Sequence, residues 1–131
     1  MKSKKKRKVN PWSPSAPYAQ IEEKLVRSKG FRDLRAHTKW LFVEFRLRYK
    51  GNNPREIILT LSDGMKIMNE RTFRADVRIL LERGFIDLIK RGGFYKQPNI
   101  YGLSNRWKKY ENKDFIEFDL NKTLPGILKK V

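Results

Sequence analysis

The chain has 131 residues, 39% hydrophobic and 12% aromatic, which favours one folded domain and argues against a disordered chain. Lysine and arginine number 31 against 14 acidic residues, so the net charge is +17 and predicts a polyanionic partner. No cysteine is present, which excludes disulfides, thiolate metal sites and cysteine nucleophiles.

The sequence predicts neither a membrane span nor a secretory signal peptide. No apolar run approaches the roughly 18 residues of a membrane span, and no apolar segment follows the basic start as in a signal peptide. We therefore expect a soluble cytoplasmic protein with no membrane partner.

Residues 1–18, "MKSKKKRKVNPWSPSAPY", predict a flexible basic arm with prolines. Six of the first eight residues are positively charged, and the remainder keeps 25 basic against 14 acidic residues, a net charge of +11. The arm residues expected to bind phosphates are Lys4, Lys5, Lys6, Arg7 and Lys8. "KKKRKV" is identical to the core of a viral nuclear import signal, so nuclear import and an added tag are alternatives to a bacterial, nucleoid-associated phosphate-binding arm.

Two helices are predicted next. "AQIEEKLVRSKG" has Ile21 and Leu25 on one face and Gly30 where a C-cap belongs, which predicts a short helix. A longer helix is expected from Leu34 to Tyr49. Its apolar stripe contains Leu34, Leu41, Phe42, Phe45 and Tyr49.

The turn formers between Gly51 and Pro54 end that helix. "IILT" is β-branched and brief, which predicts a short strand. A second short helix is expected to start at Thr60, with Asp63 as part of a capping box and Ser62 as the alternative cap, and to stop near Asn69.

The stretch "RTFRADVRILLERGF" predicts an amphipathic helix over 70–83. Its apolar stripe contains Phe73, Val77, Leu80 and Leu81, and Gly84 supplies the stop. "FIDLIK" and "IYGLS", joined by a glycine-containing turn, predict a β-hairpin. The order of elements predicts a mainly α fold with a small β-hairpin, a winged helix-turn-helix over 19–110, and a tail over 111–131 that packs on or extends it.

The predicted helix 70–83 offers one arginine face. Arg71, Arg74 and Arg78 stand at i, i+3 and i+7, and arginine bidentate to guanine is the commonest specific base contact in the major groove. Asn69, Glu70 and Thr72 at the helix start are placed for phosphate or base contacts. The alternative is that these arginines pair with Asp76 and Glu82 and face water.

The hairpin tip, "KRGGFYKQ", is the second basic feature. The residues expected to grip phosphates there are Lys90, Arg91, Gly92, Gly93 and Lys96. Phe94 is expected in the core. Trp107 and Tyr110 are expected to anchor the tail, although the run "RWKKY" would also suit stacking on a single strand.

These segments resemble a known family. The run "LRAHTKWLFVEFRLRYKGNN…IILTLSDGMKIMNERTFRADVRILLERGFIDLIKRGG", within residues 31–110, is similar to small winged helix-turn-helix DNA-binding proteins of phages, plasmids and bacterial mobile elements. The resemblance implies binding to duplex DNA in replication or transcription control of a mobile element. The helix from Thr60 departs from the pattern, because it is short and holds Gly64, a poor helix former.

An enzyme is not expected. The single histidine, His37, has no evident cysteine or carboxylate companion, which favours a structural or surface role. Four acidic residues of the tail could in principle bind Mg²⁺ in a nuclease, but their spacing matches no metal-site motif: Glu111, Asp114, Glu117 and Asp119. We expect no cofactor, no metal and no small-molecule ligand.

An RNA-binding or ribosome-associated protein is the alternative. The charge and the aromatic residues would serve either polymer, but the deep, narrow major groove of RNA does not admit a reading helix. A homodimer would suit DNA reading, because one helix covers few base pairs, although no sequence feature demonstrates it.

Overall fold

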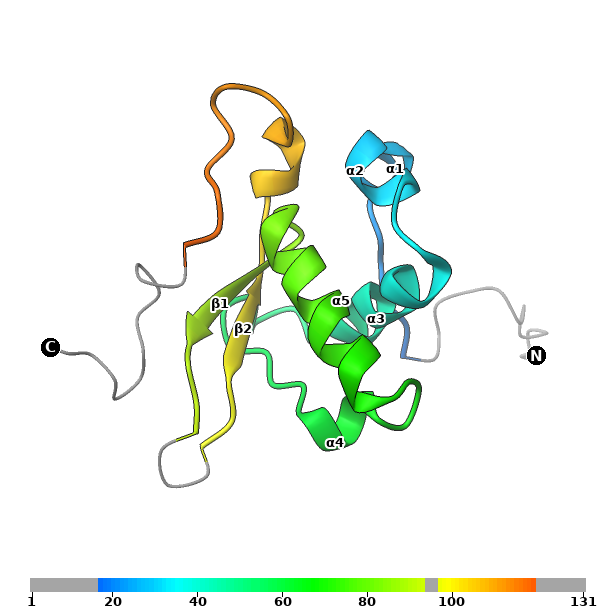
Figure 1. Cartoon of the computed structure of the whole chain (residues 1–131), viewed down its shortest axis with the longest axis vertical. Coiled ribbons are helices and arrows are strands. Elements are labelled where there is room, and N and C mark those ends of the chain that lie inside the picture. The colour runs from blue at the N-terminus through cyan, green and yellow to red at the C-terminus, as the bar shows by residue number, and fades with distance from the viewer. Residues whose placement is uncertain (1–16, 94–96, 120–131) are drawn as a thin grey trace, which may run out of the picture.

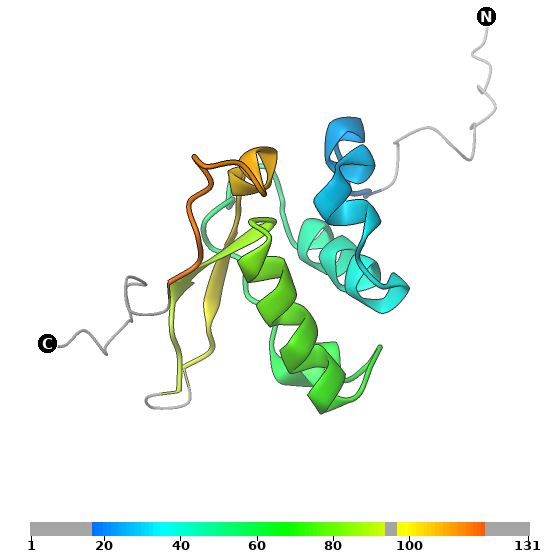
Figure 2. The ribbon, with the colours of Figure 1, turned by 45° about the horizontal axis from the view of Figure 1, so that its top comes forward.

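The computed structural model of the chain describes residues 17–93 and 97–119. Its elements are α1 (Glu23–Arg27), α2 (Lys29–Arg32), α3 (Ala36–Leu47), α4 (Leu61–Gly64), α5 (Glu70–Glu82), β1 (Ile86–Lys90), β2 (Ile100–Leu103) and the 3-10 helix η2 (Arg106–Lys109). The two strands form an antiparallel hairpin, and α5 lies between that hairpin and α3 (Figures 1 and 2). The predicted mainly helical fold with a small hairpin is confirmed, and it is compatible with a winged helix.

The short first helix is in fact two helices. Ser28 ends α1 and caps α2, where its hydroxyl accepts a hydrogen bond of 3.3 Å from the Phe31 amide. Gly30 therefore lies inside α2, and the prediction that it caps the first helix is wrong. A Cβ at Gly30 would stand 3.1 Å from the ring of Tyr110, so this glycine serves close packing.

The long helix is α3, within the predicted 34–49. The buried residues of its predicted stripe are Leu34, Leu41, Phe42 and Phe45, while Tyr49 is half-buried. The expected turn ends it: Gly51 has a φ of +96°, and the Asn53 side chain accepts from the Lys50 amide at 2.7 Å. The same side chain donates to the Arg48 carbonyl at 3.1 Å, which satisfies an orphan carbonyl at the helix end.

In place of the strand predicted for "IILT", the structure has a single isolated β-bridge. Ile57 exchanges two backbone hydrogen bonds with Tyr101, of 2.9 and 2.7 Å, but no longer ladder forms. The reason is the next element, since Thr60 is already in position as the N-cap of α4. The Leu103 amide also donates to the Pro54 carbonyl at 2.8 Å, so this segment is held against β2 at two points.

The second short helix has the predicted capping box but not the predicted length. The Asp63 amide donates to the Thr60 hydroxyl at 3.1 Å, and the Thr60 amide donates to the Asp63 carboxylate at 3.0 Å. The helix ends at Gly64 rather than near Asn69. A Cβ at Gly64 would lie 2.1 Å from the ring of Phe73, so the glycine lets α4 approach α5 closely.

Aromatic rings make up the centre of the core. Phe31, Phe42 and Phe85 meet edge to face with ring centroids 5.6–5.8 Å apart. Trp107 stacks on Phe85 at 6.2 Å and is 7% exposed, which confirms that it anchors the chain after the hairpin. Among the described residues, no helix has the length and apolarity needed to span a membrane.

Candidate nucleic-acid interface

The helix predicted over 70–83 is α5, and both of its ends are capped. The Asn69 side chain accepts from the Thr72 amide at 2.9 Å, so its oxygen serves as the N-cap. Gly84 has a φ of +84°, and the Phe85 amide donates to the Leu80 carbonyl at 3.0 Å, as in a Schellman ending. The sequence predicted both ends of this helix correctly.

The inner side of α5 is held by a polar cluster that the sequence did not reveal. Asp76 is 1% exposed; it accepts from the Thr38 hydroxyl at 2.8 Å, and its second oxygen is 2.6 Å from His37 Nδ1. The expectation that His37 has no carboxylate companion is wrong. The two residues are 39 positions apart, and only the crossing of α3 and α5 brings them together.

The outer side of α5 carries the three arginines. Arg71, Arg74 and Arg78 are all exposed, and the exposed, small Ala75 lies on the same side. Within the part of the chain that the structure describes, Arg71 makes no hydrogen bond or ion pair. The alternative that these arginines pair with Asp76 is wrong, because Asp76 is buried on the other side of the helix.

Two of the arginines do form ion pairs along the helix. Arg74 Nε lies 2.9 Å from a Glu70 oxygen, and Arg78 Nε lies 2.7 Å from a Glu82 oxygen. The alternative of paired arginines is thus right for Arg78 and Glu82. All four side chains are at least half exposed, and such i,i+4 pairs are worth only about 0.3–0.5 kcal/mol.

The hairpin places further positive charge beside α5. Lys90 and Arg91 are exposed at its described end, where Gly92 donates to the Asn99 side chain at 2.7 Å. A Cβ at Gly92 would lie 2.1 Å from the Gln97 carbonyl, and Gly93 has a φ of +103°. A larger residue would therefore clash at Gly92 and be strained at Gly93. The remaining predicted contacts lie outside the described residues: Lys96 of the wing, Lys4, Lys5, Lys6, Arg7 and Lys8 of the arm, and Phe94.

A groove of about 680 Å³ separates α5 from the hairpin. Its lining includes Arg74 and Arg78 of α5, Asn99 and Tyr101 of the hairpin, and Phe118 of the tail. Burial raises the pKa of Tyr101, while the Asn99 hydrogen bond and the nearby charge of Arg74 act in the opposite direction. α5 and the hairpin lie side by side (Figure 1), and Arg74 and Arg78 share this groove with Gly93 and Asn99 of the hairpin.

The tail contributes a residue that the sequence did not single out. The Arg78 guanidinium lies 5.6 Å from the centre of the Phe118 ring, a cation–π contact on the outer side of α5. The tail is held there by Arg106, which donates to the Ile116 carbonyl at 2.8 Å and pairs with Asp87 at 2.8 Å. Arg106 is largely buried, so it is a structural residue rather than a stacking platform.

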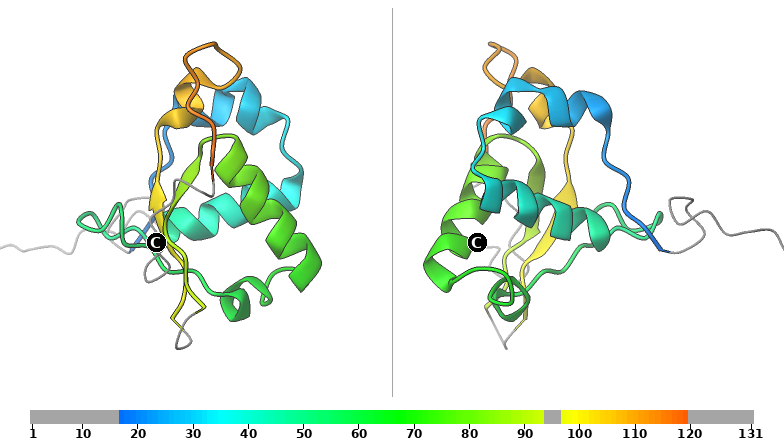
Figure 3. Two further views of the ribbon diagram at one scale, coloured as in Figure 1. Left: turned by 60° about the vertical axis from the view of Figure 1, so that its left-hand side comes forward. Right: turned by 90° about the vertical axis from the view of Figure 1, so that its right-hand side faces the viewer.

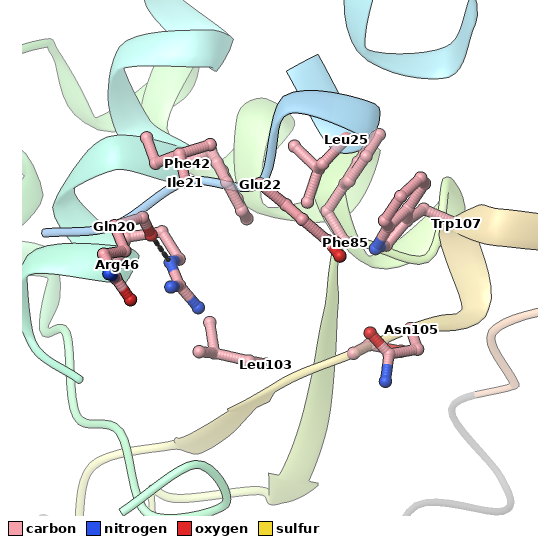
Figure 4. Close-up of a pocket in the computed structure, with 11 residues that line it drawn as sticks. Gln20, Ile21, Glu22, Leu25, Phe42, Arg46, Phe85, Leu103, Asn105 and Trp107 are labelled. Atoms are coloured by element: carbon pink, nitrogen blue, oxygen red, sulfur yellow. Dashed lines mark hydrogen bonds between the residues drawn. The ribbon is translucent and has the colours of Figure 1, made fainter. Parts of the chain in front are cut away.

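A second cavity lies where residues 20–25, α3 and the start of η2 meet. It measures about 560 Å³ and is lined by Leu25, Arg46, Phe85 and Trp107 among others (Figure 4). Arg46 Nε donates to the Gln20 carbonyl at 2.7 Å, and burial lowers the pKa of Arg46. No residue of α5 lines this cavity.

The acidic tail residues do not form a metal site in the described ranges. Residues 17–93 and 97–119 contain no group of three or more His, Asp or Glu side chains placed to hold a metal ion. Instead, Glu111 lies 3.4 Å from Lys29, and Asp114 lies 3.8 Å from Lys109. These are surface ion pairs.

Comparisons with known proteins identify no family. No family model matches the chain, and no curated protein or solved structure shows significant similarity to it.

Proposed function

We propose that the protein is a sequence-specific double-stranded DNA-binding protein that reads the major groove with α5 and grips phosphates with the hairpin and the basic arm. The observation that carries this proposal is the two-sided construction of α5. Its inner side is fixed by Asp76 and the core, while its outer side presents Arg71, Arg74 and Arg78 beside the hairpin.

The ion pairs on α5 are compatible with base reading. A bidentate arginine–guanine contact discriminates by about 1–3 kcal/mol, whereas each i,i+4 pair is worth about 0.3–0.5 kcal/mol. It is therefore favourable for Arg74 or Arg78 to leave its glutamate partner and bind a guanine edge instead. The two carboxylates also repel phosphates, which penalises any docking in which the arginines do not reach a base.

Ala75 supports the same use of the helix. A small side chain between the arginines lets the backbone of α5 come close to the groove floor, and its methyl group can contact the methyl of thymine. The role in replication or transcription control of a mobile element rests on the sequence resemblance and belongs to this proposal.

The test is a fluorescence-anisotropy titration of the whole chain against a random-sequence duplex and a hairpin RNA at several salt concentrations. We expect tighter binding to the duplex and, if six to eight phosphates are neutralised, a log–log salt slope of about −5 to −7. Equal or tighter RNA binding would favour the alternative, an RNA-binding or ribosome-associated protein.

Specificity is tested next, on a site selected from a random pool. Arg71→Ala should cost about 1–3 kcal/mol on the selected site and little on random DNA, because this arginine reads a base. Removing Met1 to Lys8 should weaken binding to all sequences alike, because that segment contacts phosphates. Equal losses on both DNAs for Arg71→Ala and Arg74→Ala would contradict base reading by α5.

A further inference from the structure

The outward side of α3 carries an apolar line that the DNA-binding proposal does not use. It consists of Ala36, Trp40, Val43 and Leu47, here called the α3 seam. Trp40 is 53% exposed and Leu47 is 44% exposed, although the opposite side of the same helix is fully buried. In the right-hand view of Figure 3, α3 crosses the middle of the molecule, with α1 and α2 above it and α4 below.

The spacing of the α3 seam is that of a helix-pairing surface. Its residues follow at intervals of four, three and four, which is the a/d pattern of a heptad. Single exposed apolar residues are ordinary, but this line continues over three turns of helix and contains a half-exposed tryptophan. A seam of this kind is complementary to a second helix with the same pattern.

The charges beside the seam indicate which helix that is. Lys39 and Glu44 flank it on opposite sides, at the g and e positions of the heptad. In a parallel pair of two copies, each Lys39 faces Glu44 of the other copy; in an antiparallel pair, Lys39 faces Arg46, a like charge. Within one copy, the contacts of these two charged side chains are weak. Lys39 Nζ is 5.8 Å from the centre of the Phe31 ring, and the Glu44 carboxylate is 3.9 Å from the Arg48 guanidinium.

We propose that the α3 seam is the interface of a homodimer in which two copies of α3 pack in parallel. No seam residue belongs to α5, so the contact leaves the arginine face free. The inference deepens the DNA-binding proposal, because a dimer carries two reading helices, but it can be measured without DNA. Its failure and the failure of DNA binding are therefore distinguishable.

The dimer should be weak and should respond to salt in a characteristic direction. One three-turn helix face lies at or below the small end of stable interfaces, and a chain with a net charge of +17 repels its own copy. Screening relieves that repulsion, so self-association should strengthen as salt is raised. DNA binding should weaken over the same range, which separates the two equilibria.

Cysteine cross-linking tests the parallel arrangement, because the chain contains no cysteine of its own. In a parallel pair, Leu47→Cys places two thiols at facing a positions, within disulfide reach after mild oxidation. In an antiparallel pair about the same seam, the two thiols would be about 16 Å apart along the axis. Asn112→Cys, an exposed position in the tail, is the matched control.

Sedimentation of the full-length chain completes the test. The wild-type mass should rise above the monomer value of 15.7 kDa with concentration, and Trp40→Glu should weaken self-association by about ten-fold or more. Lys39→Glu alone should weaken it, and the double variant Lys39→Glu/Glu44→Lys should restore it. A monomer at all concentrations, or Leu47→Cys cross-linking no more than Asn112→Cys, would overturn the proposal.

Discussion

Both sides of α5 carry carboxylates, but the carboxylates of the two sides have different roles. On the inner side, Asp76 is buried and bonded to Thr38 and His37 from a distant helix. On the outer side, Glu70 and Glu82 form solvent-exposed ion pairs with arginines one turn away. A buried carboxylate that loses its partners leaves an uncompensated charge, whereas an exposed pair can open at little cost. The comparison separates polar contacts that hold the helix from those that can be exchanged for a ligand.

The largest effect is expected where α4 meets the inner side of α5. Gly64→Ala would place a methyl group 2.1 Å from the Phe73 ring, so the two helices must move apart or the ring must leave its position. We expect a loss of about 3 kcal/mol in the free energy of unfolding, measured by urea denaturation. Ser62→Ala, at an exposed position in the same short helix, is the control and should change stability far less. Equal stability of the two variants would show that Phe73 is not packed as described.

The next effect tests the buried carboxylate itself. Asp76→Asn keeps the shape of the side chain but removes the charge that Thr38 and His37 contact, and should cost about 1–3 kcal/mol of stability. Glu82→Gln, on the outer side of the same helix, is the matched comparison, with an expected loss below about 0.5 kcal/mol. Similar losses in chemical denaturation would remove the distinction between the two sides.

Acid should weaken the capping box of α4, the short helix that packs against the inner side of α5. The backbone and side-chain hydrogen bonds with Thr60 hold the pKa of Asp63 below its ordinary value of 3.8. Because the folded-state pKa is depressed, this contribution to stability is present above the ordinary pKa and is lost as the pH falls through the folded value. We expect Asp63→Asn to flatten the dependence of thermal stability on pH below about pH 4. An unchanged acid profile would mean that the capping box does not contribute.

The smallest effect is expected on DNA affinity from the outer side. Glu82→Gln removes a carboxylate that competes for Arg78 and repels phosphates, so affinity for all duplexes should rise by about two-fold. Anisotropy titrations at low salt would measure it, with Glu117→Gln in the tail as a control for the loss of one negative charge. A decrease in affinity would mean that Glu82 orients Arg78 for DNA rather than competing with it.

Local sequence signals determined where α5 and the hairpin lie. The apolar spacing of Phe73, Val77 and Leu80, together with Gly84, fixed the helix and its end, because these signals depend on neighbours within one or two turns. The arginine face followed from the same periodicity. For the same reason, the Thr60–Asp63 capping box was predictable from four residues.

Only the tertiary structure decided which polar residues are free and which are occupied. The pairing of His37 with Asp76, the closeness of Gly64 to Phe73 and the contact of Phe118 with Arg78 all join segments that are distant in sequence. A propensity or a periodicity describes one segment at a time, so it cannot tell that a charged residue will be buried by another helix. The sequence therefore located the candidate reading helix, and the packing of α3, α4 and the tail decided which of its side chains face solvent.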